Sequence, residues 1–283
     1  MSTSSDRVLV PIGPQTRYIL STSGRPASVR RYRALLEALG LDLAYIVINS
    51  DKPKIDAKDF VAAIRGLRAL GGAISKDIKN LVVAELDEVD ALALKIGAVN
   101  TVARRGDRLV GFNTDALGFA EAVRNGIKGL QVDSAVVYGY GGVTNVVAAV
   151  LGDLGISVRV TGRRRAAAKE TADRLGVALF DPQTHRPDLF VNAAPVTDAP
   201  LDQASNFLQA IQSCTVVFDH ELDGSYLKAY CRDHNLKHIP GTAMYWPQMH
   251  AQWSIFLEGL LPDDGDLAAM LRAAENVASS SAS

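Results

Sequence analysis

The sequence contains little cysteine, little net charge and no long apolar run. Cys214 and Cys231 are the only cysteines in 283 residues, which excludes a disulfide scaffold and predicts a reducing compartment. The 30 basic and 31 acidic residues leave a net charge of −1, which excludes a broad electrostatic surface for nucleic acid or anionic lipid. Residues 1–6 show no charged and then apolar leader, and no apolar stretch reaches the roughly 18 residues of a membrane span. We therefore expect a cytoplasmic protein without nucleic-acid or membrane partners, which holds any anion at a local site.

The length and the order of apolar patterns predict an α/β protein of two domains. The chain is long enough for about two domains of roughly 150 residues. Apolar, β-rich runs alternate with helical patterns in the first part, as expected of βα units. The expected strands are Val8–Ile12, Tyr18–Leu20, Leu43–Ile48 and Gly72–Ser75, and the expected helices are Ser28–Leu39, Ala57–Leu70 and Ala84–Ile96.

A second series follows Arg105–Thr114, a segment containing glycine and asparagine that we interpret as a hinge. Parallel strands joined by helices are the economical arrangement for this series. Helical patterns return after Gly241 and at Leu267–Val277. The expected strands are Ala135–Tyr138, Ser157–Val160, Leu189–Asn192 and Thr215–Phe218, with a helix near Val143–Leu154.

A glycine-rich turn between a strand and a helix predicts a phosphate site. The turn contains Gly139, Gly141 and Gly142. Glycines let the backbone approach a pyrophosphate, whose charge the free N–H groups of the helix N-terminus can bind. Such glycines also occur in plain tight turns, but a strand before, a helix after and a next strand about 20 residues later are typical of a dinucleotide-binding unit.

The end of that next strand indicates which dinucleotide is bound. It reads Thr-Gly followed by three arginines at 163–165, with no acidic side chain for a ribose 2′-hydroxyl. Guanidinium groups such as those of Arg163 and Arg165 suit a 2′-phosphate, which favours NADP over NAD. The alternative is a solvated helix start, although cations at a helix N-terminus oppose its dipole.

Five segments together resemble the shikimate dehydrogenase family. They occur in the family's order over most of the chain. They are the segment from Gly71 that ends in Lys79, Gly-Ala-Val-Asn-Thr at 97–101, Asn-Thr-Asp at 113–115, the glycine turn at 139–142, and Gly-Thr-Ala-Met-Tyr-Trp-Pro-Gln at 241–248. The resemblance implies a substrate domain at 1–108, completed by 244–283, and a Rossmann-type NADP domain at 109–243.

The resemblance also implies the roles of individual residues. Lys79 matches the family's catalytic lysine and Asp115 its partner carboxylate, while Asn100 and Gln248 match binders of substrate hydroxyls. A lysine oriented by an aspartate suits transfer of the hydroxyl proton, and amides offer both a donor and an acceptor to a polyol. Taken alone, Lys79 is better explained as a solvent-facing lysine at a strand end, and Asp115 as an N-cap of the helix Ala116–Val123.

The serines that hold the substrate carboxylate in this family have two possible matches. Ser21 and Ser23 lie in a Ser-x-Ser arrangement and are our choice. Ser28 falls at the second serine if the following helix is aligned without a gap, but Pro26 then replaces the first serine.

Several departures from the family pattern place the chain in a shikimate dehydrogenase-like branch. Ala73 and Ser75 replace an asparagine and a threonine, and Leu222 stands where a tyrosine is frequent. The loop starting at Asn192 lacks its glycine. Each lost hydrogen-bond partner typically costs about 1–3 kcal/mol, so shikimate itself is expected to be a poor substrate.

The resulting prediction is an NADP-dependent oxidoreductase that interconverts a hydroxyl and a ketone on a shikimate- or quinate-like cyclic polyol carboxylate. The alternative is a non-catalytic NADP-binding protein with a decayed substrate pocket. The expected partner is a small-molecule substrate, in a monomer or homodimer. No metal is expected, because Cys231, His234 and His238 lack a nearby fourth ligand.

Overall fold

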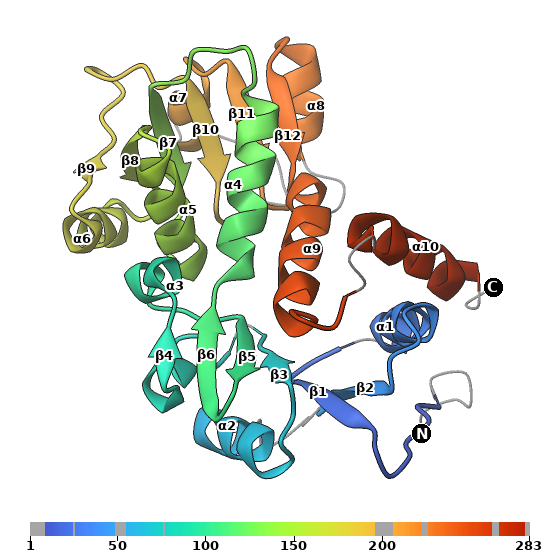
Figure 1. The fold of residues 1–283 in the computed structure, drawn as a ribbon. Helices are drawn as coiled ribbons and strands as arrows, with labels where there is room; N and C mark the ends of the chain where they lie inside the picture. The colour runs from blue at the N-terminus through green and yellow to red at the C-terminus, as the bar shows by residue number, and fades with distance from the viewer. Residues whose placement is uncertain are drawn as a thin grey trace, which may run out of the picture. The chain divides into compact units, whose positions relative to one another are not determined.

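A computed structural model describes residues 9–24, 26–48, 55–75, 77–195, 206–221, 226–261 and 266–280. The chain divides into two compact units (Figure 1). Unit 1 comprises Met1–Thr114 and Met249–Ser283, and unit 2 comprises Asp115–Gln248.

Unit 1 contains a six-stranded sheet of order β2-β1-β3-β5-β6-β4. The pairs β1–β2, β1–β3 and β4–β6 are parallel, whereas β3–β5 and β5–β6 are antiparallel. The strands are β1 (Arg17–Ser21), β2 (Leu43–Val47), β3 (Gly71–Ala73), β4 (Glu88–Val89), β5 (Thr101–Arg105) and β6 (Arg108–Phe112), and the helices are α1 (Pro26–Ala38), α2 (Ala57–Gly66), the 3₁₀ helix η2 (Val82–Glu85), α3 (Ala91–Ile96) and α10 (Leu267–Ser280).

Three sequence expectations for unit 1 are wrong. Residues 9–12 form no strand, and Val8 lies outside the described residues. The single helix expected at 84–96 is broken into η2, β4 and α3, because the Asp90 side chain accepts the N–H groups of Leu92 and Ala93 and starts α3 afresh. The expected hinge at 105–114 contains most of the β5–β6 hairpin, which turns at Gly106 with a φ of +61°.

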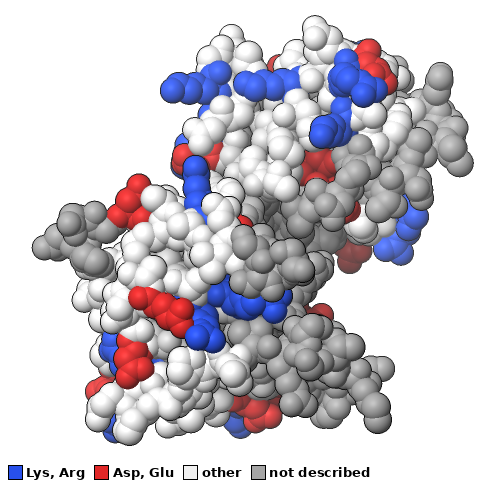
Figure 2. Space-filling model, turned by 90° about the vertical axis from the view of Figure 1, so that its right-hand side faces the viewer, with Lys and Arg blue, Asp and Glu red and all other residues white. Residues whose placement is uncertain are grey.

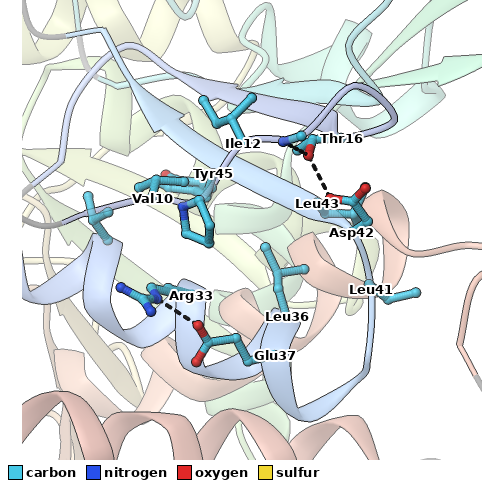
Figure 3. Close-up of a pocket in the computed structure, with 13 residues that line it drawn as sticks. Val10, Ile12, Thr16, Arg33, Leu36, Glu37, Leu41, Asp42, Leu43 and Tyr45 are labelled. Atoms are coloured by element: carbon cyan, nitrogen blue, oxygen red, sulfur yellow. Dashed lines mark hydrogen bonds and ion pairs between the residues drawn. The ribbon is translucent and has the colours of Figure 1, made fainter.

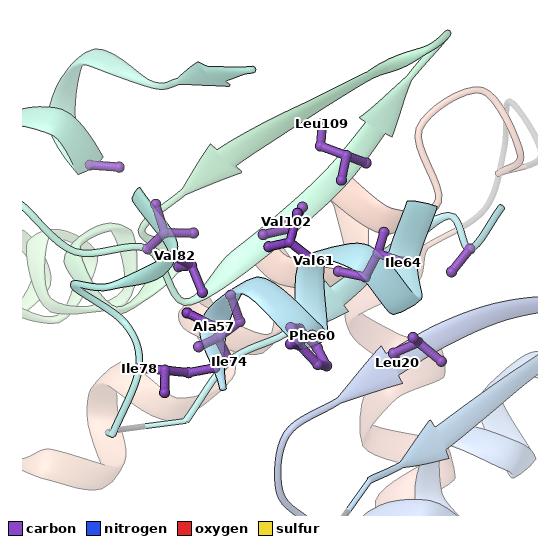
Figure 4. Packing of buried hydrophobic residues seen from close by; sticks show 13 residues of the cluster. Leu20, Ala57, Phe60, Val61, Ile64, Ile74, Ile78, Val82, Val102 and Leu109 are labelled. Atoms are coloured by element: carbon purple, nitrogen blue, oxygen red, sulfur yellow. The ribbon is translucent and has the colours of Figure 1, made fainter. Parts of the chain in front are cut away.

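The main core of unit 1 lies between α2 and the sheet. Figure 4 shows Phe60, Val61 and Ile64 of α2 directed toward Leu20, Val102 and Leu109 of the strands. Position 72 has no room for a side chain, because a Cβ there would lie 2.8 Å from the Phe60 ring. This packing fixes the short strand β3, whose carboxyl end leads toward Lys79.

A second aromatic core joins the C-terminal helices to the start of unit 1. Trp253 is fully buried, with ring centroids 4.8 Å from Tyr32 and 6.0 Å from Tyr45. An ion pair between Arg31 of α1 and Glu275 of α10 accompanies it. Long-range packing therefore returns the chain end to unit 1, as the resemblance implied for the segment after 244.

Unit 2 contains a second sheet, of order β12-β11-β10-β7-β8-β9, whose pairings are all parallel. The strands are β7 (Ser134–Tyr138), β8 (Ser157–Thr161), β9 (Ala178–Leu179), β10 (Leu189–Asn192), β11 (Val216–Asp219) and β12 (Lys237–Pro240), and the helices are α4 (Thr114–Gly126), α5 (Gly142–Asp153), α6 (Arg165–Leu175), α7 (Asn206–Ile211), α8 (Tyr226–Asp233), the 3₁₀ helix η3 (Gly241–Met244) and α9 (Tyr245–Phe256), which continues into unit 1.

The helices of unit 2 cover both faces of this sheet. Phe218 of β11 packs edge-to-face on Phe119 of α4, at 4.8 Å between centroids. On the other face, Val217 joins a cluster with Leu227 and Cys231 of α8. Strand order reverses between β7 and β10, and in such doubly wound sheets ligands bind at the carboxyl ends of the strands beside this reversal.

The two units end a few residues later than the predicted domain limits of 108/109 and 243/244. The β5–β6 hairpin holds the chain in unit 1 through Phe112, and the second division falls within α9. Met249 is the first residue after this second division. Its Sδ accepts a hydrogen bond from the Tyr32 hydroxyl at 2.9 Å. The substrate and cofactor roles assigned to the two domains stay predictions at this point.

Candidate functional site

The glycine turn of unit 2 lies at the reversal of strand order. Gly139 follows β7 with a φ of +146°, and a Cβ there would lie 2.9 Å from the carbonyl oxygen of Ala193, which follows β10. Both the backbone angle and the close approach require glycine. The turn is therefore fixed against the neighbouring strand end rather than formed as an isolated loop.

The same turn leaves the N-terminus of α5 open. Gly141 is the N-cap, without a capping side chain, and both Gly141 and Gly142 are exposed. An added Cβ at either glycine meets no atom within 4 Å among the described residues. Unpaired N–H groups of the first turn and the helix dipole make this a suitable place for a pyrophosphate.

The arginine run after β8 starts α6 at the next strand end. Arg163 and Arg165 are exposed there, which fits both an anion-binding role and a solvated helix start. The sequence did not identify the pairing of Arg164 with Tyr140. The Arg164 guanidinium lies 5.1 Å from the centre of the Tyr140 ring, and its Nε donates to the Tyr140 hydroxyl at 3.2 Å.

The Tyr140–Arg164 pair also explains why residue 162 is glycine. A Cβ at Gly162 would lie 2.8 Å from the Tyr140 ring. Tyr138, by contrast, packs edge-to-face on Phe207 in the core at 4.8 Å. Of the two tyrosines that flank Gly139, Tyr138 packs into the core and Tyr140 pairs with Arg164 at the strand end.

In unit 1, Asn100 holds the start of α4. Its side-chain oxygen accepts the backbone N–H of Thr114 at 2.8 Å, the Thr114 hydroxyl at 3.1 Å and the Thr101 hydroxyl at 2.9 Å. Asn100 is buried, and Gln252, which the sequence did not identify, donates to the Thr101 hydroxyl at 2.9 Å. The side-chain oxygen of Asn100 is thus engaged, and its amide nitrogen is the half suited to a ligand.

Lys79 lies beside this network through its backbone. It is half-buried in the turn at 77–80, and its carbonyl accepts the N–H of Val99 at 2.8 Å. The next residue, Asn100, pairs by its carbonyl with the N–H of Ile74 at 2.8 Å. Unit 1 thereby brings two of the predicted site residues, Lys79 and Asn100, to one edge of its sheet.

The candidate serines lie at the carboxyl end of β1. Ser21 is buried, its hydroxyl donates to the Ser23 carbonyl at 2.6 Å, and it also bonds with Tyr45, whose pKa is raised by burial. Ser23 is exposed, and Ser28 is half-buried in the first turns of α1. The structure therefore gives Ser21 an ordering role in the loop that carries Ser23.

Thr22 is a candidate site residue that the sequence did not reveal. Its hydroxyl donates to Ser75 Oγ at 3.1 Å and accepts the Ser75 N–H at 2.8 Å. Its own N–H pairs with the carbonyl of Ala73 at 3.0 Å. The strand ends of β1 and β3 are joined in this way, which places the hydroxyls of Thr22 and Ser75 side by side.

Asp115 and Gln248 lie on two neighbouring helices, α4 and α9. Asp115 lies in the first turn of α4, where its charge complements the helix dipole. One turn later, a Cβ at Gly118 would lie 2.6 Å from both Gln248 Cβ and the Met244 carbonyl oxygen. Glycine therefore permits α4 to approach the start of α9. Asp115 is not the N-cap, because the helix begins at Thr114.

The cavity shown in Figure 3 contains none of these residues. It is about 370 Å³ in volume and lies between residues 10–16, α1 and β2. Apolar walls such as Leu36 and Leu43 surround the Arg33–Glu37 ion pair and the hydrogen bond from Thr16 to Asp42. The motif residues, and not this cavity, define the candidate site. Leu222 and Lys76 lie outside the described residues.

The charges visible on the surface agree with a local anion site. Basic and acidic side chains are interspersed on the face of the molecule in Figure 2. Within the described residues, no helix has the length and apolar character needed to cross a membrane. The same part of the chain holds no group of three or more His, Cys, Asp or Glu side chains arranged to bind a metal ion.

Comparison with known proteins supports the assignment of these motifs. Residues 24–102 match the family model described as the shikimate dehydrogenase substrate binding domain. The NADP(+) shikimate dehydrogenase of Symbiobacterium thermophilum is 31% identical over 284 residues, covering 91% of this chain and 95% of that protein.

Two solved structures extend the comparison to both units. Shikimate 5-dehydrogenase from Thermus thermophilus, in complex with NADP(H) and shikimate, is 28% identical with a TM-score of 0.70, over 92% of this chain and 100% of that chain. Quinate dehydrogenase from Corynebacterium glutamicum, in complex with NAD, is 26% identical with a TM-score of 0.72, over 91% and 98%. With a relative matched along nearly its whole length, and with the lysine, amide and glycine-turn motifs in order on a two-domain fold, the chain belongs to the shikimate dehydrogenase family.

Proposed function

We propose that the protein is an NADP-dependent dehydrogenase that interconverts a hydroxyl and a ketone on a shikimate- or quinate-like cyclic polyol carboxylate. The observation that carries this proposal is the combination of an open glycine turn at the strand reversal of unit 2 with Lys79 and Asn100 at one sheet edge of unit 1. Relatives matched over nearly their whole length act on shikimate with NADP(+).

The residues at the glycine turn fit NADP. Gly139, Gly141 and Gly142 leave room for a pyrophosphate at the N-terminus of α5, and Arg163 and Arg165 offer guanidinium groups to a 2′-phosphate. When bound, the oxidised cofactor supplies a nicotinamide that takes up a hydride from the carbon bearing the substrate hydroxyl. The two electrons leave with that hydride, so the protein itself has only a proton to handle.

Lys79 is the group we assign to that proton. Its neutral amine would accept the hydroxyl proton during oxidation, and its ammonium would return it during ketone reduction. Asp115 would serve as the carboxylate partner that stabilises the ammonium. The Lys79 backbone is anchored to Val99, which limits the positions that its side chain can reach.

The substrate groups would be held by polar side chains at positions 22, 23, 75, 100 and 248. Asn100 would donate from its amide nitrogen, because its oxygen already accepts three hydrogen bonds. Gln248 would bind a second hydroxyl. Ser23, ordered by Ser21, and Thr22 with Ser75 would contact the polar edge of the ring and its carboxylate.

The test is turnover with and without the Lys79 amine. Purified protein is mixed with shikimate or quinate and with NADP⁺ or NAD⁺ in parallel, and formation of reduced cofactor is followed by absorbance. We expect faster turnover with NADP⁺ and a loss of about 10²–10⁴ in kcat for Lys79→Met, with unchanged NADP affinity. Lys58→Met, an exposed lysine in α2 of the same unit, is the matched control.

Two outcomes would contradict the proposal. Full activity of Lys79→Met would remove the assigned proton carrier. Tight NADP binding without turnover on any cyclic polyol carboxylate would instead identify a non-catalytic NADP-binding protein.

A further inference from the structure

Tyr140 is a side chain of the glycine turn that the proposed function does not use. It stands between Gly139 and Gly141, so its backbone belongs to the turn that would bind the pyrophosphate. The N–H of Gly139 pairs with the carbonyl of Thr161, the last residue of β8, at 2.9 Å. The Tyr140 ring lies against the end of the same strand, where a Cβ at Gly162 would come within 2.8 Å of it. Tyr140 therefore links the turn after β7 to the end of β8.

The side chain of Arg164 packs on this ring. Its guanidinium carbon lies 5.1 Å from the ring centre, and its Nε donates to the Tyr140 hydroxyl at 3.2 Å. This hydrogen bond is the main cause that lowers the pKa of Tyr140, and the charge of Arg163 acts in the same direction. A cation over an aromatic face and a hydrogen bond together restrict an exposed arginine, which would otherwise lose rotamer freedom when it binds a ligand.

The held form of Arg164 suits a phosphate. Because Nε is engaged by Tyr140, the Nη1 and Nη2 groups are the donors left for a ligand, and paired guanidinium donors match phosphate oxygens. Arg164 is the N-cap of α6, but its side chain makes no capping hydrogen bond. In dinucleotide-binding sheets, the strand after the glycine turn carries the residues that meet the 2′ position of the ribose. Arg164 follows that strand, β8.

We propose that Tyr140 is a positioning residue for Arg164, and that this pair sets the preference of the chain for a dinucleotide with a 2′-phosphate over one with a free 2′-hydroxyl. The inference rests on the proposed function, in which NADP binds at the glycine turn. Arg163 and Arg165 add positive charge at the same strand end, whereas Arg164 adds a guanidinium group whose position is set before the cofactor arrives. Tyr140 should therefore matter for NADP and not for NAD.

The first test compares the affinities for NADP⁺ and NAD⁺ by calorimetric titration. Tyr140→Phe keeps the ring but removes the hydroxyl, and we expect the preference for NADP⁺ to fall about threefold. Tyr140→Leu also removes the aromatic face, and we expect a fall of about tenfold, with the NAD⁺ affinity unchanged in both variants. Arg174→Met is the matched control, since this exposed arginine of α6 donates to Asn145 at 3.0 Å and should keep the native preference.

The second test asks whether Tyr140 acts through Arg164. We expect Arg164→Met to lower the preference for NADP⁺ by about tenfold or more, because a charged donor to the phosphate is lost. Adding Tyr140→Phe to Arg164→Met should then change the preference no further, since the positioned group is already absent. A further fall in the double variant would show that Tyr140 contacts the cofactor itself, and would overturn the positioning role.

Binding of adenosine 2′,5′-bisphosphate and of AMP gives the same comparison without the nicotinamide and without turnover. An inactive protein in which the Tyr140 variants still lower the preference for the bisphosphate would refute the proposed activity and support this inference. The inference fails if the native protein binds the two ligands equally well. It also fails if Tyr140→Leu keeps the native preference, or weakens both ligands equally as general damage to the turn would.

Discussion

The two units build their parts of the site by different means. In unit 2 the proposed phosphate site consists of backbone at glycines without side chains: Gly139 approaches Ala193, and Gly141 is the uncapped start of α5. In unit 1 the site consists of side chains held by partners from distant segments, such as Asn100 by Thr114 and Thr22 by Ser75. The turn at Gly139 has no room for an added Cβ, whereas the side chains in unit 1 depend on their hydrogen-bond partners, so the two should fail under different substitutions.

The largest effect should come from removing the aromatic core of unit 1. Trp253→Ala leaves a cavity beside Tyr32 and Tyr45, and we expect a loss of about 3–5 kcal/mol in the free energy of unfolding. Urea denaturation followed by circular dichroism measures it. Trp246→Ala, at a half-buried position in the same helix, should cost clearly less. Equal losses for the two variants would show that the core does not depend on Trp253.

The next effect tests the backbone site of unit 2. Gly139→Ala adds a Cβ 2.9 Å from the Ala193 carbonyl at a φ of +146°, which costs about 1–3 kcal/mol in strain. We expect lower stability and an NADP affinity weaker by about tenfold or more, measured by calorimetric titration. Gly152→Ala in the last turn of α5, where an added Cβ meets nothing within 4 Å, should leave NADP binding intact. If Gly139→Ala bound NADP with native affinity, cofactor binding in unit 2 would not depend on the backbone geometry at this glycine.

Substitution of Asn100 tests the side-chain site and sharpens the comparison. Asn100→Ala removes the acceptor for Thr114 N–H, and we expect a loss of about 1–2 kcal/mol in stability together with a raised KM for the polyol. Asn100→Asp keeps the acceptor but lacks the amide donor, so stability should be largely restored while KM stays high. If Asn100→Asp recovered a native KM, the amide nitrogen would have no role in binding.

The smallest effect concerns a surface carboxylate of unit 1. Asp87 accepts from Arg65 at 3.0 Å and from the Leu109 N–H at 2.7 Å, and these bonds lower its pKa. A folded-state pKa below the unfolded value gives stability that is present above the unfolded pKa and is lost as pH falls through the folded pKa. Thermal unfolding of Asp87→Asn should therefore show a shallower decline in Tm at acid pH than the native protein. Asp107→Asn, at the exposed hairpin turn, should decline as the native protein does.

The signals that could be read from the sequence were those confined to a few consecutive residues. The strand, glycine turn and helix around Gly139 follow from propensity and spacing, and the expected strands of unit 2 match β7, β8, β10 and β11 within a residue at each end. The hairpin of β5 and β6 was missed because its turn at Gly106 resembles a linker in composition. The interruption of the expected helix at Asp90 was missed because the helical spacing of apolar residues continues on both sides of it.

The site residues divide in the same way. Lys79, Asn100, Asp115 and Gln248 stand in short motifs and could be named from a resemblance, although their roles still await measurement. No local sequence pattern identifies Thr22 or Gln252. Each is positioned by a hydrogen bond to a residue far away in the chain. Arg31, on a face of α1 that looks basic in sequence, is buried against Glu275 of α10 for the same reason.

By itself the sequence determined the alternation of strands and helices, the glycine turn with arginines one strand later, and the family, because each depends on side-chain types at short spacing. The tertiary structure alone decided that the Asn100 oxygen caps α4 and that Gly118 lets α4 approach α9. Those arrangements join segments far apart in the chain, and it is the packing of helices on the sheets that sets which polar groups meet.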